Sequence, residues 1–334
     1  MPGVISNNYA DGITLSANPT TLTGTITNAQ AAVYAGAGTD WTLTNDGLIS
    51  SSSYYGVALI GPGAVSNAAG ASIAGYFGGI VGYRDITLTN AGTIGATSNF
   101  GSGVLSYQYG DVDNLAGAVI TGDEAINLSY GGTVENAGTI AATEFAIITG
   151  GGLIDNAAGG VIRGEIPILF EGSGTVINAG TIAAVPGGIA ISFDGPNNVL
   201  VLEPGGVLTG PVDGFRAGDM LDFAGLTASS ASFAGGILTL YAGSASPCRT
   251  GLMTRRVTAS PSAAPAAGQG CRARNTVWST PSRPKLNVSP PLSKSCPSGS
   301  ASPARSRGMP PASPHPIESP STASLAPSAC RARA

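Results

Sequence analysis

A large aliphatic residue stands two positions before a recurring asparagine through most of the first 210 residues. The aliphatic residues are Ile26, Leu43, Val65, Leu88, Val112, Val134, Ile154, Val176 and Leu200. The asparagines are Asn28, Asn45, Asn67, Asn90, Asn114, Asn136, Asn156 and Asn178, and Leu202 takes the ninth place. Successive markers are 17 to 24 residues apart, and a typical unit has 22 residues. Self-similarity at such a period is the sequence signature of a repeat architecture.

The spacing after each asparagine takes a short form and a long form. In the short form the next large aliphatic comes four residues later, as at Ile49, Ile94, Ile140 and Ile182. In the long form it comes six residues later, as at Ile73, Ile120, Ile162 and, after Leu202, Leu208. Strand side chains alternate between two faces, so an insertion of two residues leaves the aliphatic pointing the same way. This pattern predicts a strand, a turn and a second strand with an inward column on each side.

Each unit also contains a third strand-like run, bounded by Gly-rich turns. These runs occupy 55–61, 79–84, 103–108, 125–130, 145–150, 167–172 and 188–193. Three short strands per unit, without helical periodicity, predict an all-β, right-handed parallel β-helix of about nine coils. Successive coils are then expected to lie about 4.8 Å apart.

The pattern divides the chain into four regions. We expect an irregular N-terminal capping coil at 1–27, β-helix repeats at 28–208, and a C-terminal β cap at 209–243. Within the cap, GDMLDF and GGILTLY are interpreted as strands of a closing hairpin or sheet. Covered ends are expected because an open coil presents unpaired strand edges.

The recurring asparagines predict an internal ladder. Equivalent positions of successive coils stack, and stacked side-chain amides can hydrogen-bond to one another or to turn backbone groups. The glycine two or three residues later is expected to supply positive φ. The eight asparagines Asn28, Asn45, Asn67, Asn90, Asn114, Asn136, Asn156 and Asn178 are therefore assigned a structural role.

Charge separates the chain into two unlike parts. Residues 1–245 carry 18 acidic residues and three arginines, a net charge of −15, without Lys, His or Cys. A segment with so few cations is not expected to hold nucleic-acid phosphates. No apolar run is long enough for a transmembrane helix. The first twenty residues lack the basic start and apolar stretch of a cleavable signal, which leaves the export route open.

Residues 244–334 are predicted to be a disordered tail. Ser, Pro, Ala and Arg make up 56 of the 89 residues from 246 onward, so little apolar surface is available to offset the entropy of ordering. The abrupt change in composition fits an out-of-frame translation, and a natural basic Pro/Ser-rich tail is the alternative. The spacing of the four cysteines matches no zinc or thioredoxin-type motif.

Carboxylates supply the candidate chemistry. Stacking places Asp113, Glu135 and Asp155 in one outward column on successive coils, and Asp123, Glu124, Glu144 and Glu165 line a second face. Paired carboxylates suit glycoside hydrolysis, and stacked ones could bridge Ca²⁺, but an ordinary solvated face is the simpler interpretation. Asp219 and Asp222 could ligate a cation at the cap or form a turn. We expect no catalytic residue and no cofactor beyond this weak Ca²⁺ candidate.

Aromatic residues form a second candidate site. Tyr55, Phe77 and Phe100 stand ten residues after their asparagines on three adjacent coils. Such a row is a core stack if it faces inward and a sugar-stacking platform if it faces outward, and we favour core or lateral packing. Candidates for exposed contacts are Tyr54, Tyr76, Tyr107 and Tyr109.

The repeated unit (T/I)(V/L)xNAGTI and the end sequence NNVLVLEPGGVLTGPVDGFRAGDMLDFAGLTASSASFAGGILTLY resemble bacterial autotransporter-like and large adhesin-like surface proteins. The resemblance covers roughly residues 10–242. It implies a β-helical passenger region, export to the cell surface or medium, and a part in adhesion, aggregation or biofilm.

The sequence thus predicts a non-enzymatic, extracellular or cell-surface adhesin-like module. The expected partners are carbohydrate, a cell-surface protein or a second copy of the chain, without nucleic acid. The alternative is a polysaccharide-active β-helix enzyme, either a lyase or a glycoside hydrolase.

Overall fold

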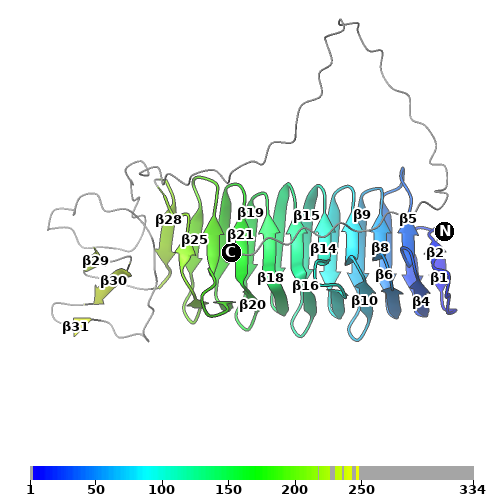
Figure 1. Cartoon of the computed structure of the whole chain (residues 1–334), viewed down its shortest axis with the longest axis horizontal. Helices are drawn as coiled ribbons and strands as arrows, with labels where there is room; N and C mark the ends of the chain where they lie inside the picture. The colour runs from blue at the N-terminus through cyan, green and yellow to red at the C-terminus, as the bar shows by residue number, and fades with distance from the viewer. Residues whose placement is uncertain (1–2, 217, 226–229, 235–236, 243–245, 248–334) are drawn as a thin grey trace, which may run out of the picture. The chain divides into compact units, whose positions relative to one another are not determined.

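The computed structural model describes residues 3–216, 218–225, 230–234, 237–242 and 246–247. These residues form strands and turns, and none of them is helical. From β1 to β28 the strands pair in parallel, each with its equivalent in the next coil (Figure 1). The predicted parallel β-helix is confirmed, with about ten coils instead of nine.

The strands stack in three columns. The first column is one 11-stranded sheet, of β1 (Gly3–Ile5), β3 (Thr20–Leu22), β6 (Trp41–Asn45), β9 (Gly63–Asn67), β12 (Ile86–Asn90), β15 (Tyr109–Asn114), β17 (Gly131–Asn136), β19 (Gly152–Asn156), β22 (Gly174–Asn178), β25 (Val199–Leu202) and β28 (Met220–Phe223). The second column contains β4 (Thr25–Asn28), β7 (Leu48–Ser51), β10 (Ser72–Gly75), β13 (Thr93–Ala96), β20 (Val161–Gly164), β23 (Thr181–Ala184) and β26 (Val207–Thr209). The third column contains β2 (Ile13–Thr14), β5 (Val33–Ala35), β8 (Tyr55–Leu59), β11 (Gly78–Gly82), β14 (Ser102–Ser106), β21 (Ile166–Phe170), β24 (Ile191–Phe193) and β27 (Val212–Asp213).

Two long strands join the second and third columns. β16 (Val119–Leu128) pairs with β13 through its first residues and with β14 through its last ones. β18 (Thr139–Thr149) continues both pairings on the next coil. These two coils therefore contain two strands each, whereas three short strands were predicted for every coil.

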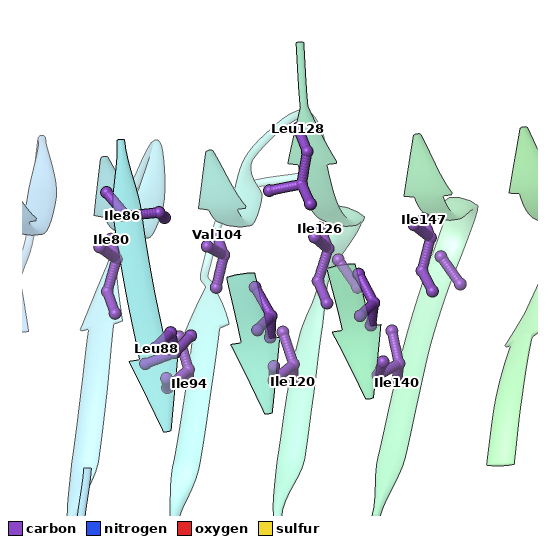
Figure 2. Packing of buried hydrophobic residues seen from close by; sticks show 14 of the residues in the cluster. Ile80, Ile86, Leu88, Ile94, Val104, Ile120, Ile126, Leu128, Ile140 and Ile147 are labelled. Atoms are coloured by element: carbon purple, nitrogen blue, oxygen red, sulfur yellow. The ribbon is translucent and has the colours of Figure 1, made fainter. Parts of the chain in front are cut away.

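The core consists of vertical files of aliphatic side chains. Val112, Val134 and Ile154 pair directly across β15, β17 and β19, and each is at most 2% exposed. Figure 2 shows the same stacking for Ile80, Val104, Ile126 and Ile147 of the third column. Because each coil adds one aliphatic residue to each file, the apolar core is continuous along the stack.

The turn insertion of two residues preserves the register as predicted. Asn90 pairs with Asn114 before the turn, and Ile94 pairs with Ile120 after it, although the second coil has the longer spacing. Both isoleucines are fully buried.

Glycines serve the two turn forms in different ways. In the long form Gly70, Gly117, Gly159 and Gly205 have positive φ between 81° and 89°. In the short form the glycine does not have positive φ, contrary to the prediction. Gly138 is needed for close approach instead, because a Cβ there would lie 2.5 Å from the backbone oxygens of Ala118 and Leu115.

The first coils correct the sequence alignment. Asn28 pairs with Ser51 in the second column, and Ile26 pairs with Ile49 there. The first-column position that aligns with Asn45 is occupied by Leu22. The assignment of Asn28 and Ile26 to the first column is therefore wrong. The predicted capping region, 1–27, contains paired strands of the same columns, beginning with β1 on β3.

At the other end, parallel pairing continues beyond residue 208. β28, the GDMLDF strand, pairs in parallel with β25 and not with the GGILTLY strand. That second strand, β30 (Ile237–Ala242), pairs antiparallel with β29 (Ser230–Ala234) and β31 (Ser246–Pro247). Apart from β31, the predicted tail at 244–334 lies outside the described residues.

Candidate functional site

Seven of the eight predicted asparagines form one hydrogen-bonded ladder. Each side-chain Nδ2 donates to the Oδ1 of the next coil over 2.8–2.9 Å, in the order Asn45, Asn67, Asn90, Asn114, Asn136, Asn156, Asn178. The same Nδ2 atoms also lie 3.2–3.3 Å from a backbone carbonyl after the turn, such as that of Thr139 for Asn114. All seven side chains are buried. The ladder thus gives the buried side-chain amides their hydrogen-bond partners, and it leaves none of these amides exposed to a ligand.

Asn28 is outside this ladder. Its Nδ2 donates to the backbone oxygen of Ala31 over 3.1 Å within the same turn. At the other end, Asn178 donates to the backbone oxygen of Val207 over 3.0 Å, because Leu202 stands where the next asparagine would be.

The structure brings the predicted carboxylate column together. Asp113 pairs with Glu135, and Glu135 pairs with Asp155, on three successive coils. These side chains are half-buried or exposed, on the outer face of the first column. Among the described residues, no group of three or more Asp, Glu, His or Cys side chains is arranged to hold a metal ion.

Several carboxylates of the second acidic set bind neighbouring side chains. Glu124 Oε2 accepts hydrogen bonds from Ser102 Oγ over 3.1 Å and from Asn127 Nδ2 over 2.9 Å. Asp123 accepts one from the Thr143 hydroxyl. Glu144 and Glu165 are exposed. These contacts support a structural role for Asp123 and Glu124.

Asp219 stabilises the last coil. Its carboxylate is fully buried, and its Oδ1 accepts hydrogen bonds from the backbone N–H of Asn198 over 2.7 Å and from Asn198 Nδ2 over 3.2 Å. Its Oδ2 accepts the backbone N–H of Arg216 over 2.6 Å. Oδ2 therefore closes the turn from Arg216 to Asp219, whereas Oδ1 joins this turn to Asn198, 21 residues earlier in the chain. Asp222, on β28, is half-buried and pairs in register with Val201.

The predicted ring row, defined as Tyr55, Phe77 and Phe100, lies on the surface of three successive coils. Ring centroids are 6.3 Å apart between Tyr55 and Phe77 and 5.9 Å apart between Phe77 and Phe100. The interplanar angles, 45° and 47°, are nearly equal. Phe77 is 37% exposed and Phe100 61%, so a core stack is wrong for these two residues, which pack laterally against neighbouring rings.

Two exposed tyrosines flank the ring row. Tyr54 makes edge contacts with Tyr55 and Phe77, at centroid distances of 5.0 and 5.9 Å. Tyr76 makes edge contacts with Phe77 and Phe100, at 5.2 and 5.7 Å. Edge-to-face contacts at these distances are favourable because the positive ring edge meets the negative ring face.

Tyrosines at the other end of the same strands reach toward this group. Tyr83 follows β11, Tyr107 follows β14, and their ring centroids are 5.3 Å apart. The hydroxyl of Tyr107 lies near that of Tyr55, and the hydroxyl of Tyr83 lies near that of Tyr54. Burial, followed by the nearby hydroxyls of Tyr107, Tyr83 and Tyr54, raises the pKa of Tyr55 to about 12.

Burial also raises the pKa of Tyr83, together with the hydroxyls of Tyr54, Tyr107 and Tyr34. Tyr34 thereby joins the same cluster from β5. These eight residues form what we call the aromatic patch: Tyr34, Tyr54, Tyr55, Tyr76, Phe77, Tyr83, Phe100 and Tyr107.

The aromatic patch accounts for two buried residues outside the core. Ala58 and Val81 pair across β8 and β11 at positions that alternate with the core residues Val57 and Ile80. They are nonetheless only 3% and 0% exposed, and they are absent from the core cluster. Tyrosines that approach from both ends of these strands explain this outer burial.

Part of this patch was predicted from the sequence. Tyr54, Tyr76, Tyr107 and Tyr109 are exposed, as predicted, but Tyr109 makes a tilted ring contact with Tyr130, at a centroid distance of 6.3 Å, and has no ring contact with the patch. Tyr34 and Tyr83 were missed. For Tyr83 a signal exists, because it and Tyr107 each come directly after residues that pair in register, Gly82 and Ser106.

No helix among the described residues is long and apolar enough to cross a membrane. Comparison of the chain with protein-family models, curated proteins and solved structures gives no significant match. The function is therefore inferred from the geometry of the described side chains.

Proposed function

We propose that the chain is a non-enzymatic adhesion module that binds a partner through the aromatic patch. The observation that carries this proposal is the gathering of eight aromatic side chains over neighbouring coils, seven of them exposed. Contiguous exposed apolar surface of this kind marks interaction sites, where Tyr and Phe are enriched.

The positions of the cations favour binding over catalysis. A lyase requires a positive group beside its carboxylates to stabilise developing charge. Of the three described arginines, Arg84 lies in the turn between β11 and β12, and Arg163 lies on β20 of the second column, whereas the carboxylate column is on β15, β17 and β19 of the first. Arg216 donates to the backbone oxygens of Gly214 and Phe193.

An extracellular or cell-surface location follows from the proposed adhesive role. The repeated (T/I)(V/L)xNAGTI unit, similar to that of adhesin-like surface proteins, supports this location. Carbohydrate, a surface protein and a second copy of the chain are the partners that an aromatic surface suits.

Adhesion can be tested with beads that carry the full chain. We expect these beads to attach to cells or to aggregate, and expect the double variant Tyr76→Ala/Phe100→Ala to reduce attachment severalfold. Tyr130→Ala is the matched control, because Tyr130 is 60% exposed and Phe100 61%. Attachment that is equal for all three proteins would contradict the proposal.

The polysaccharide-enzyme alternative rests on the register of Asp113, Glu135 and Asp155. Paired positions about 4.8 Å apart approach the spacing used by retaining glycosidases. Release of reducing ends or unsaturated products from a polysaccharide panel, abolished by Glu135→Gln, would establish this alternative. We expect no such release.

A further inference from the structure

We propose that the aromatic patch binds a neutral glycan chain that lies along the direction in which the coils stack. This inference rests on the adhesive function proposed above and specifies its ligand. Four features of the patch favour such a ligand: the spacing of the ring row, the rigidity of its flanks, its polar rim and its charge.

The ring row offers one stacking surface per coil. Tyr55 begins β8, Phe77 lies in the turn between β10 and β11, and Phe100 lies in the turn between β13 and β14. Their centroid spacings of 6.3 and 5.9 Å are comparable to the length of one pyranose unit in an extended glycan. Successive sugars could therefore stack on successive coils, with their apolar C–H faces on the rings.

The flanking tyrosines hold this surface in place. Tyr54 and Tyr76 each stand edge-on against two rings of the row, at interplanar angles between 77° and 88°. Phe77 contacts both tyrosines, and Tyr55 and Phe100 contact one each, which reduces the number of alternative rotamers. Little side-chain entropy is then lost on binding, so such a surface binds a flexible glycan better than isolated side chains would.

Tyrosine hydroxyls give the patch a polar rim. Tyr54, Tyr83 and Tyr107 are each about 40% exposed, and their hydroxyls lie close to other hydroxyls of the cluster. A phenolic hydroxyl both donates and accepts, so it can also bond to the equatorial hydroxyls of a sugar. An apolar floor beside hydroxyl groups matches the two kinds of surface that a pyranose presents.

The charges in and around the aromatic patch favour a neutral ligand. None of the eight patch residues is charged, and the turn after β11 carries one residue of each sign, Arg84 and Asp85. Residues 1–245 as a whole have a net charge of −15. Uronic-acid and sulfated glycans would be repelled by this field, whereas neutral glycans would not.

The test is calorimetric titration of the full chain with gluco-, manno- and xylo-oligosaccharides and with oligogalacturonate and heparin oligosaccharides. We expect a neutral series to bind with an affinity that rises from the monosaccharide to the trisaccharide and changes little beyond it. Phe100→Ala is expected to weaken binding about 3- to 10-fold, the equivalent of one aromatic contact. Tyr130→Ala should leave the affinity unchanged.

Phe77→Ala is a second variant, and thermal unfolding checks that each variant is folded. Phe100→Leu separates ring stacking from simple apolar contact, and we expect it to weaken binding as Phe100→Ala does. Binding of the anionic series only, or neutral binding that Phe77→Ala and Phe100→Ala leave unchanged, would overturn the inference.

The bead assay separates the two proposals. If the beads attach through the patch but no glycan binds, the neutral-glycan inference fails and the adhesive function stands. If neither attachment nor glycan binding occurs, both fail.

Discussion

At the scale of single residues, the two turn forms need glycine for different reasons, and substitution should show this. Gly117 has φ of 81° and open space around its missing Cβ, so Gly117→Ala should cost about 1–2 kcal/mol. At Gly138 a Cβ would meet two backbone oxygens at 2.5 Å, so Gly138→Ala should cost more. Urea unfolding of both variants checks this order, and a milder effect at Gly138 would contradict it.

The ladder makes a second residue-scale prediction. Asn114→Ala removes the acceptor of Asn90 Nδ2 and the donor to Asn136 Oδ1, both buried. We expect the free energy of unfolding to fall by about 1–3 kcal/mol. The control is Asp113→Ala on the same strand, whose half-exposed side chain should change stability by less than about 0.5 kcal/mol. Equal losses would show that the ladder contributes nothing.

Tyr55 makes stability depend on alkaline pH. Its pKa is about 12 in the folded chain and 10.0 in the reference state, so the folded protein holds this proton more tightly. The resulting stability is present below pH 10 and is lost as the pH rises through 12. Denaturant unfolding should show a smaller decrease across this window in Tyr55→Phe than in the unaltered chain. An identical decrease would contradict the assigned cause.

At the scale of elements, turns should tolerate two added residues but not one. Replacing the short turn Ala91–Gly92 by the four-residue turn 115–118 keeps Ile94 facing the core, because side-chain direction alternates along a strand. Inserting a single alanine after Ala91 would turn Ile94 outward. We expect near-native thermal unfolding for the first variant and a large loss of stability for the second. Comparable stability of both would contradict the register.

Much of the fold was predictable because equivalent positions of successive coils in a β-helix carry similar residues at a regular spacing. The paired asparagines and the buried aliphatic files of 43–208 follow directly from spacing. The first coil was misaligned because the TITN segment ending at Asn28 imitates the first-column motif, although the interval of 17 residues to Asn45 was already too short. Strand periodicity alone does not tell one column from another.

The candidate site was less predictable for a physical reason. Equal spacing placed Tyr55, Phe77 and Phe100 on neighbouring coils, but Tyr55 pairs with Gly78 and not with Phe77. The turn that precedes Tyr55 therefore has one residue more than the turn that contains Phe77. The alternation of side chains along a strand does not predict the direction of a side chain within an irregular turn. The burial of Val81 depends on tyrosines that come from both ends of the strands. The sequence does not show that these tyrosines lie close together, because they belong to different coils and to different turns.

At the scale of the whole β-helix, the outer faces of two columns differ. Outward positions of the first column include Asp113, Glu135 and Asp155, whereas those of the third include Ala58 and Val81 beneath the tyrosines. The same repeat thus builds a solvated acidic face and an aromatic face, and only the second has the composition of an interaction site. The proposed function depends on the stacking order that creates these faces.

Thiol cross-linking tests that stacking order most directly. In a full-length chain whose four native cysteines are replaced by serine, Asp113→Cys/Glu135→Cys places two thiols at directly paired positions, and Asp113→Cys/Thr133→Cys places them two residues out of register. A short reagent that fluoresces only when both of its thiol-reactive groups have reacted should give fluorescence with the first pair and none with the second. Equal labelling of both pairs, or labelling of the second alone, would contradict the stacked coils on which the fold and the aromatic patch depend.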